Sequence, residues 1–256
     1  MYTGFNLSLD NEDFFSDDNY YEKGKEKYST IKRCALSNLK QIIGNKIING
    51  DALQNLWFPN EFFRDKSFVF ISHSHADEEL AIKLAGYLYE KFGIYSFIDS
   101  CVWMHSDDLN KELNNCSLKE YNRCNSCGCE EFSYNISCVH MMLASALTAM
   151  IDKCECIFFL NTPSSLNINR KTESPWIYYE LNIANVIQKI SRINVPTMES
   201  AKYMLHSIEF TPKLDDMIDI DAGVLLKWEN MFNPFTDNPY AVLYKICGGI
   251  KRNGTS

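Results

Sequence analysis

The chain has 256 residues, of which 46% are hydrophobic, and its 25 basic and 33 acidic side chains give a net charge of −8. This length and apolar content predict one large domain, or one domain with extensions, and exclude wholesale disorder. The lack of a clustered basic run argues against nucleic-acid binding, and no apolar run approaches the ~20 residues that span a bilayer.

Residues 1–10 show neither the basic nor the apolar region of a secretion signal, so the sequence predicts a cytoplasmic protein. In that compartment the ten cysteines are expected as reduced thiols or metal ligands rather than disulfides.

Residues 1–65 are interpreted as an N-terminal helical extension that carries no chemistry. The first 20 residues are acidic and aromatic with little periodicity, and apolar spacing predicts a helix over 28–43. Gly44, Gly50 and Pro59 then punctuate a connecting stretch.

From residue 66 the pattern alternates between strands and helices. A helix is expected from Asp77, as its N-cap, to Gly93, as its stop. Alternation of this kind predicts an α/β fold with a flavodoxin-like parallel sheet of about five strands. The expected strands are 68–71, 94–98 and 156–160, and the further helices are 139–152 and 176–190.

Ligands of such sheets bind beyond the carboxyl ends of the strands. Ser72, Asp99 and Asn161 follow the three predicted strands. We therefore expect them at one edge of the sheet.

The last segment, 196–256, is interpreted as a C-terminal extension that packs on the domain formed by 66–195. Phe210 is a candidate for a further strand, and 240–246 for a closing helix or strand.

The common nucleotide-binding motifs are missing. No G-x-G-x-x-G follows the first predicted strand, and no G-x-x-x-x-G-K-[ST] occurs anywhere. This argues against a Rossmann dinucleotide site and against a P-loop.

Three motifs in order resemble the TIR domain over about 66–195. They are an apolar strand that ends in Ile71-Ser72 and a polar turn, Phe97-Ile98-Asp99, and Trp176-x-x-x-Glu180-Leu181. With its flanking extensions, the chain is similar to the NAD-consuming TIR proteins of bacterial Thoeris antiphage systems. That resemblance implies an NAD+ hydrolase or ADP-ribosyl cyclase that makes a cyclic or conjugated ADP-ribose messenger.

By this resemblance, Glu180 falls on the catalytic glutamate of the family. Cleavage of the nicotinamide–ribose bond builds an oxocarbenium-like centre, which a nearby carboxylate stabilises. Nicotinamide is a good leaving group, so one acid suffices. Without the resemblance, the favoured interpretation of Glu180 is a solvated helix residue or a residue that caps a loop.

The other predicted substrate-binding residues lie near the strand ends or in the loops beside them. Trp176 lies one helical turn from Glu180 and is either a wall of the ribose pocket or a core anchor. The remaining candidates are Ser72, His73, Asp99, Trp103 and His140.

A cysteine-rich insertion occupies about 111–138. Cys124-x-x-Cys127-x-Cys129 has a spacing compatible with structural zinc. Only one C-x-x-C is present, however, so free thiols are the favoured interpretation and no cofactor is predicted apart from NAD+ as substrate.

The alternative function is a non-catalytic TIR scaffold for protein–protein signalling. A third hypothesis is an enzyme of similar topology that processes deoxynucleosides. The resemblance further implies an effector reached through the messenger, a phage-derived activator and self-association through TIR contacts.

Overall fold

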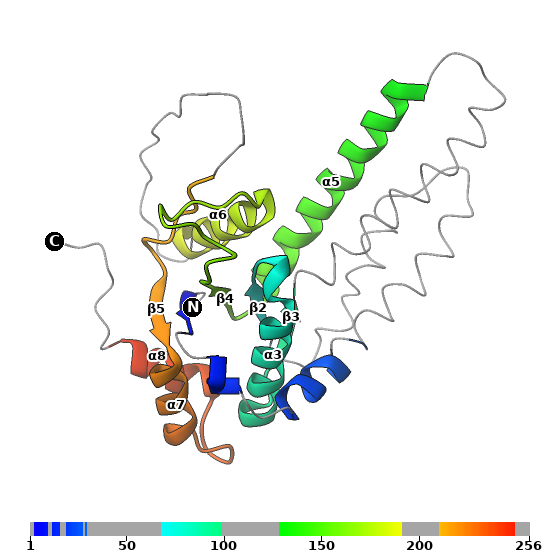
Figure 1. The fold of residues 1–256 in the computed structure, drawn as a ribbon. Helices are drawn as coiled ribbons and strands as arrows, with labels where there is room; N and C mark the ends of the chain where they lie inside the picture. The colour runs from blue at the N-terminus through cyan, green and yellow to red at the C-terminus, as the bar shows by residue number, and fades with distance from the viewer. Residues whose placement is uncertain are drawn as a thin grey trace.

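The fold is built on one five-stranded parallel sheet with the strand order β3-β2-β4-β1-β5. The computed structural model describes residues 3–9, 12–15, 19–27, 29, 68–98, 128–190 and 210–248. Helices flank the sheet (Figure 1), so the predicted α/β class is confirmed. The strands are β1 (Thr3–Ser8), β2 (Phe68–Ser72), β3 (Tyr95–Ile98), β4 (Cys156–Leu160) and β5 (Ile218–Asp221).

The helical elements alternate with these strands along the chain. Two are short 3-10 turns, and the others are α-helices. They are η1 (Glu12–Phe15), η3 (His75–Asp77), α3 (Glu78–Phe92), α5 (Gly128–Lys153), α6 (Pro175–Ile190), α7 (Ala222–Met231) and α8 (Pro239–Cys247).

The first strand differs from the sequence prediction. Residues Thr3–Ser8 form a strand between β4 and β5, although a helical extension was expected over 1–65. Only Phe5 and Leu7 are strongly apolar in β1, and Gly4 and Asn6 separate them. This alternation is too short to indicate a strand by itself. The strand forms because it pairs with β4 and β5, which are distant in sequence. The sheet therefore draws strands from all three predicted segments.

The strand order is that of a flavodoxin-like sheet in which β1 takes the fourth place. Read from β2, the chain first adds β3 on one side and then β4 on the other. The carboxyl ends of β2 and β4 thus form the topological switch point, where ligands of open α/β sheets bind.

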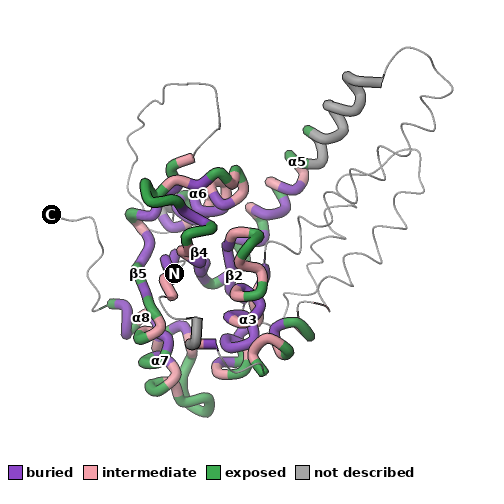
Figure 2. Tube along the Cα trace, in the orientation of Figure 1, coloured by how far each residue is buried: buried purple, intermediate pink, exposed green. Residues whose placement is uncertain are grey.

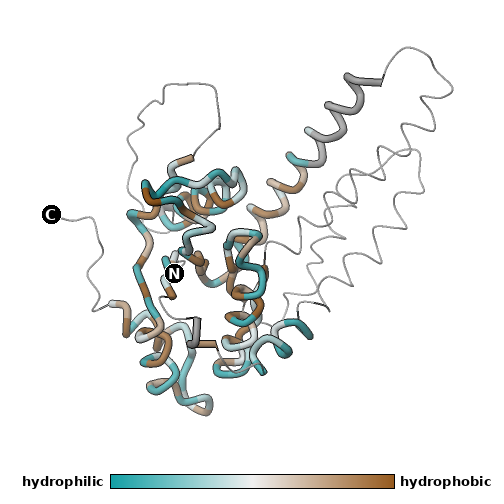
Figure 3. Tube along the Cα trace, viewed as in Figure 1, coloured by the Kyte–Doolittle hydropathy of each residue, from teal (hydrophilic) through white to brown (hydrophobic). Residues whose placement is uncertain are grey.

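Alternating strand residues serve two separate cores. Val69 and Ile71 of β2 belong to the core under α3, α7 and α8, whereas Phe68 and Phe70 belong to the core under α5 and α6. Figure 2 shows the strands and the inner sides of these helices as buried, and Figure 3 shows hydrophobic residues along them. Two-sided coverage explains why β2 and β4 are continuous apolar runs.

Helix α3 confirms the predicted element and its stop. Gly93 adopts the left-handed conformation (φ 66°). Its N–H bonds to the Tyr89 carbonyl at 2.9 Å, and the Ile94 N–H bonds to the Leu88 carbonyl at 3.2 Å. The predicted cap is different in detail, because Asp77 occupies the N-cap position without a side-chain cap hydrogen bond.

A helix over 19–27 lies directly against α3 at two glycines. A Cβ added to Gly86 would lie 1.8 Å from the Tyr20 carbonyl oxygen, and one added to Gly24 would lie 2.0 Å from the Ile82 carbonyl oxygen. The two backbones approach this closely only because neither position has a side chain.

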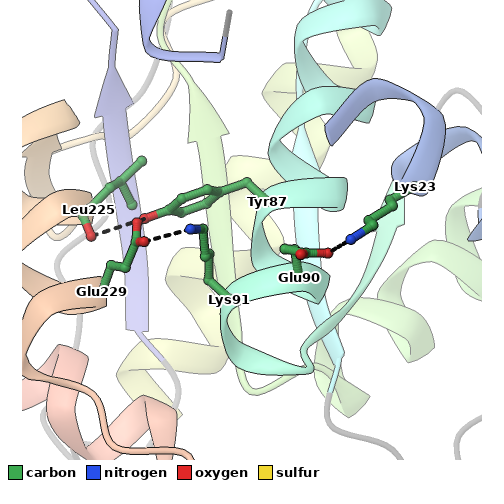
Figure 4. Close-up of polar contacts among 6 residues, drawn as sticks. All are labelled: Lys23, Tyr87, Glu90, Lys91, Leu225 and Glu229. Atoms are coloured by element: carbon green, nitrogen blue, oxygen red, sulfur yellow. Dashed lines mark hydrogen bonds and ion pairs between the residues drawn. The ribbon is translucent and has the colours of Figure 1, made fainter. Parts of the chain in front are cut away.

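Charged pairs surround α3 (Figure 4). Lys23 of the 19–27 helix pairs with Glu90 of α3, and Lys91 of α3 pairs with Glu229 of α7 at 2.6 Å. Tyr87 donates its hydroxyl to the Leu225 carbonyl at 3.1 Å. The hydrogen bond to Glu229 raises the pKa of Lys91.

The other predicted elements agree in place but differ in extent. Helix α5 begins at Gly128, earlier than the expected residue 139, and α8 shows that the closing element is a helix. Phe210 forms only an isolated antiparallel bridge with Thr172, and the fifth strand follows later in the chain. The predicted helix over 28–43 lies outside the described residues.

Within the part of the chain that the structure describes, no helix is long and apolar enough to cross a membrane.

Candidate functional site

A buried hydrogen bond joins β2 to α6 at the switch point. The Ser72 hydroxyl donates to Glu180 Oε2 at 2.6 Å, and both residues are 0% exposed. Ser72 ends β2, and alternation along the strand turns its side chain to the face covered by α6. The interpretation of Glu180 as a solvated helix residue is therefore wrong.

The helix that carries Glu180 begins with recognisable start signals. Pro175 is its first residue, where a missing N–H costs nothing. The Ser174 hydroxyl accepts a hydrogen bond from the Ile177 N–H at 3.3 Å. This start places Trp176 one turn before Glu180.

Aromatic rings gather beside this turn of α6. His140, exposed on α5, meets Trp176 edge-on with ring centroids 5.9 Å apart and planes at 86°. Trp176 is half-buried and also contacts Tyr179, whose hydroxyl donates to the Ala144 carbonyl at 2.9 Å. Helices α5 and α6 thus jointly position two of the predicted substrate-binding residues.

Of its two predicted roles, the structure shows Trp176 in the anchor role, and the pocket-wall role stays a prediction. It packs against the core under α5 and α6, which is the anchor role, while its ring edge meets an exposed imidazole.

The loops after β2 and β4 are tied together near the same edge. Thr162 donates its hydroxyl to Asp77 Oδ2 at 2.5 Å, and the Thr162 N–H donates to Ser165 Oγ at 2.9 Å. Ser165 in turn donates to the Leu160 carbonyl at 2.9 Å. These bonds fix the β4–α6 loop relative to the turn that follows Ser72.

Of the remaining predicted site residues, the structure describes only some. His73 follows Ser72 and is 3% exposed. Asp99 and Trp103 lie outside the described residues, as do Cys124 and Cys127. Cys129 lies within α5. No group of three potential metal ligands occurs among the residues that the structure describes.

Sequence reasoning missed a second polar pair on the same face of the sheet. Asn6 Nδ2 of β1 donates to Asp219 Oδ1 of β5 at 2.7 Å. The available signal was the alternation of apolar and polar residues in β5, which reads Ile-Asp-Ile-Asp.

This arrangement brings an acceptor group to a protected position beside aromatic rings. A carboxylate held there accepts hydrogen bonds from hydroxyl groups and stabilises positive charge that develops on a bound molecule. Comparisons of the chain with protein-family models, with curated proteins and with solved structures found no match.

Proposed function

We propose that this chain is a TIR-like enzyme that cleaves the nicotinamide–ribose bond of NAD+, with Glu180 as its catalytic carboxylate. The observation that carries the proposal is the Ser72–Glu180 pair, a carboxylate buried where β2 and β4 end. The predicted TIR motifs around Ser72 and Trp176 add the choice of NAD+ as substrate.

The chemistry asks for one well-placed negative charge. As the glycosidic C–N bond breaks, its electron pair leaves with nicotinamide and neutralises the pyridinium nitrogen. The ribosyl carbon becomes positive, and Glu180 stabilises that charge. An acceptor then forms a new bond to this carbon and loses a proton. Water as acceptor gives ADP-ribose, an adenine nitrogen or a ribose hydroxyl gives a cyclic product, and a second molecule gives a conjugate.

The hydrogen bond from Ser72 serves as a positioning contact in this proposal. It holds one carboxylate oxygen at a defined place on the strand, so the carboxylate meets the ribose already oriented. A ribose hydroxyl offers the same kind of donor that Ser72 provides.

The ring pair supplies a place for the nicotinamide. Trp176 and His140 offer apolar ring surface and a polar edge next to the turn of α6 that leads to Glu180. His73, Asp99 and Trp103 complete the proposed pocket on the strength of the family resemblance.

The proposed biological role follows the same resemblance. The product is a nucleotide messenger in antiphage defence, made in the cytoplasm, and it activates a separate effector. A phage-derived trigger and self-association belong to this proposal.

The competing function is a TIR scaffold without catalysis. It draws support from the same bond, because a fully buried Ser72–Glu180 contact also fastens α6 to β2. An enzyme acting on deoxynucleosides would use the carboxylate in the same way on a smaller substrate.

Nicotinamide release from NAD+ by the purified chain, with and without lysate of phage-infected cells, tests the proposal. Glu180→Gln keeps the size of the side chain and removes its charge, so the rate should fall by about 10²-fold or more. Glu173→Gln, at an exposed position just before the helix, is the matched control and should retain full rate.

The scaffold is favoured if neither condition releases nicotinamide, or if Glu180→Gln matches wild type. Release of a free base from deoxynucleosides but not from NAD+ identifies the third function.

A further inference from the structure

Glu180 is closed off from solvent in the structure. It is 0% exposed, as is Ser72, and His73 beside them is 3% exposed. A carboxylate stabilises the positive ribosyl carbon only if the ribose lies against it. The structure therefore describes a closed state, which has to open before a ribose reaches Glu180.

The closed state needs contacts that hold α6 in place. Among the described residues, Glu180 is the only Asp, Glu, Lys or Arg that is buried. Burial of a carboxylate is costly even where the carboxylate accepts hydrogen bonds. Contacts elsewhere on α6 therefore have to offset the cost of keeping this carboxylate out of water.

One face of α5 makes such contacts with the start of α6. His140, Ala144 and Thr148 are spaced four residues apart, so they lie on the same face of the helix. His140 meets the Trp176 ring, and the Ala144 carbonyl accepts from the Tyr179 hydroxyl at 2.9 Å. The Thr148 hydroxyl lies 2.6 Å from the Tyr179 hydroxyl.

These contacts reach α6 next to the buried carboxylate. Tyr179 immediately precedes Glu180, and Trp176 lies one turn before it. Helix α5 also contacts β2, the strand that ends at Ser72. Helix α5 thus contacts both elements that join in the Ser72–Glu180 bond.

Helix α5 also extends well beyond this contact. It spans Gly128–Lys153, a length of about 39 Å, and residues 128–139 precede His140. Figure 1 shows this helix extending away from the sheet. Because a helix moves as a rigid element, a partner that displaces its first half also displaces the face that holds Tyr179.

We propose that α5 holds α6 in a resting, closed state that hides Glu180, and that separation of Tyr179 from α5 opens the site. This inference rests on the proposed function and supplies its regulation. A trigger that binds α5 opens the site without touching the substrate. Release of Tyr179 lets the start of α6 move away from α5, and a ribose then reaches the carboxylate.

The test measures the exposure of Glu180 directly. The folded chain is treated with a water-soluble carbodiimide and glycinamide, which convert accessible carboxylates to amides, and mass spectrometry reads each position. In wild type, the exposed Glu173 should react rapidly and the buried Glu180 slowly.

Tyr179→Phe keeps the ring and removes the hydroxyl that bonds to α5. It should raise the labelling rate of Glu180 about fivefold, the change that one lost hydrogen bond makes to a two-state equilibrium. Nicotinamide release without phage lysate should rise by the same factor. Thr148→Val removes the partner hydroxyl and repeats the test from α5 should Tyr179→Phe fail to fold.

Tyr178→Phe is the matched control. Tyr178 lies one residue earlier on α6 and stacks on Phe210, with ring centroids 4.8 Å apart. The same substitution there leaves the contact between Tyr179 and α5 in place, so the labelling of Glu180 and the release of nicotinamide should match wild type. Glu173 should react at the same rate in every variant.

The inference is overturned if Glu180 of wild type reacts as fast as Glu173, since the resting site is then open. Unchanged labelling of Glu180 in both Tyr179→Phe and Thr148→Val overturns it too, as does an equal rise in Tyr178→Phe. A rise confined to Tyr179→Phe and Thr148→Val supports it. If that rise comes with no nicotinamide release in any chain, with or without phage lysate, the closed state stands and the proposed function fails.

Discussion

Thr162 and Asp77 are joined by a 2.5 Å hydrogen bond across the carboxyl edge of the sheet. One belongs to the β4–α6 loop and the other to the turn after β2. Asp77 thus occupies a helix N-cap position, yet its carboxylate serves the neighbouring loop. The bond links the loop after β4 to the turn after β2, the strand whose last residue, Ser72, bonds to Glu180.

Thr162→Val removes the donor at nearly constant volume. The Asp77 carboxylate loses this partner, so the free energy of unfolding should fall by about 1 kcal/mol and the melting temperature by about 2–4 °C. Thermal unfolding followed by circular dichroism measures the change. His75→Ala, exposed in the same turn, should leave the melting temperature as it is. Equal melting of wild type and Thr162→Val would show that the loops are held by other contacts.

Ser72→Ala and Glu180→Gln should separate stability from catalysis. Ser72→Ala leaves a fully buried carboxylate without one donor, at a cost of about 1–3 kcal/mol. Glu180→Gln keeps an oxygen that accepts from Ser72, so we expect a smaller loss of stability together with loss of nicotinamide release.

Urea unfolding of both variants, read beside the activity assay, provides the comparison. The scaffold function gains support if Glu180→Gln is the less stable of the two and its loss of stability explains any loss of activity.

The sequence predicted those parts of the fold whose signal is local. Strands β2 and β4 are covered on both faces, and each forms a continuous apolar run that is recognisable by itself. Strands β1 and β5 are mixed with Asn6, Asp219 and Asp221 on one face, so their signals are weak. Strand β1 pairs with β4 and β5, and β5 pairs with β1, so the place of each depends on a partner more than 150 residues away along the chain.

The candidate site divides in the same way. The strand-end rule placed Ser72 in the site, and helix spacing placed Trp176 beside Glu180; the structure brings these elements together. Asn6 could not be found, because nothing near it in sequence indicates that β1 lies two strands from Ser72.

Gly86→Ala should separate the 19–27 helix from α3. Alanine ordinarily stabilises a helix by about 1 kcal/mol over glycine, but here its methyl would meet the Tyr20 carbonyl oxygen at 1.8 Å. We expect a net loss of about 2–3 kcal/mol from overpacking, measured by chemical denaturation.

Gly93→Ala is the control for this variant. Its new methyl has no neighbour within 4 Å, so only the left-handed backbone is penalised, by about 1 kcal/mol. A Gly86→Ala chain no less stable than Gly93→Ala would contradict the close approach of the two helices.

Stability should fall as the pH rises from about 9 toward 11. Burial raises the pKa of the Cys247 thiol from 9.0 to about 11. The folded chain therefore holds this proton more tightly than the unfolded chain, and the resulting stabilisation is complete below pH 9 and lost through that window.

Cys247→Ala removes this titration, so its stability should depend less steeply on pH between 9 and 11 than that of wild type. Val242→Ala on the same helix removes packing without removing a titrating group, and should keep the wild-type slope. Identical slopes for wild type and Cys247→Ala would show that the thiol titrates alike in both states.

The position of β1 has a consequence for how the chain is made. The ribosome synthesises Thr3–Ser8 long before either neighbouring strand, β4 or β5, exists. The earliest strand must therefore wait for the last one, and its pairing closes the longest loops of the fold, which slows folding. Until β4 and β5 are made, both edges of β1 stay unpaired. The nascent chain is therefore most prone to misassembly through β1.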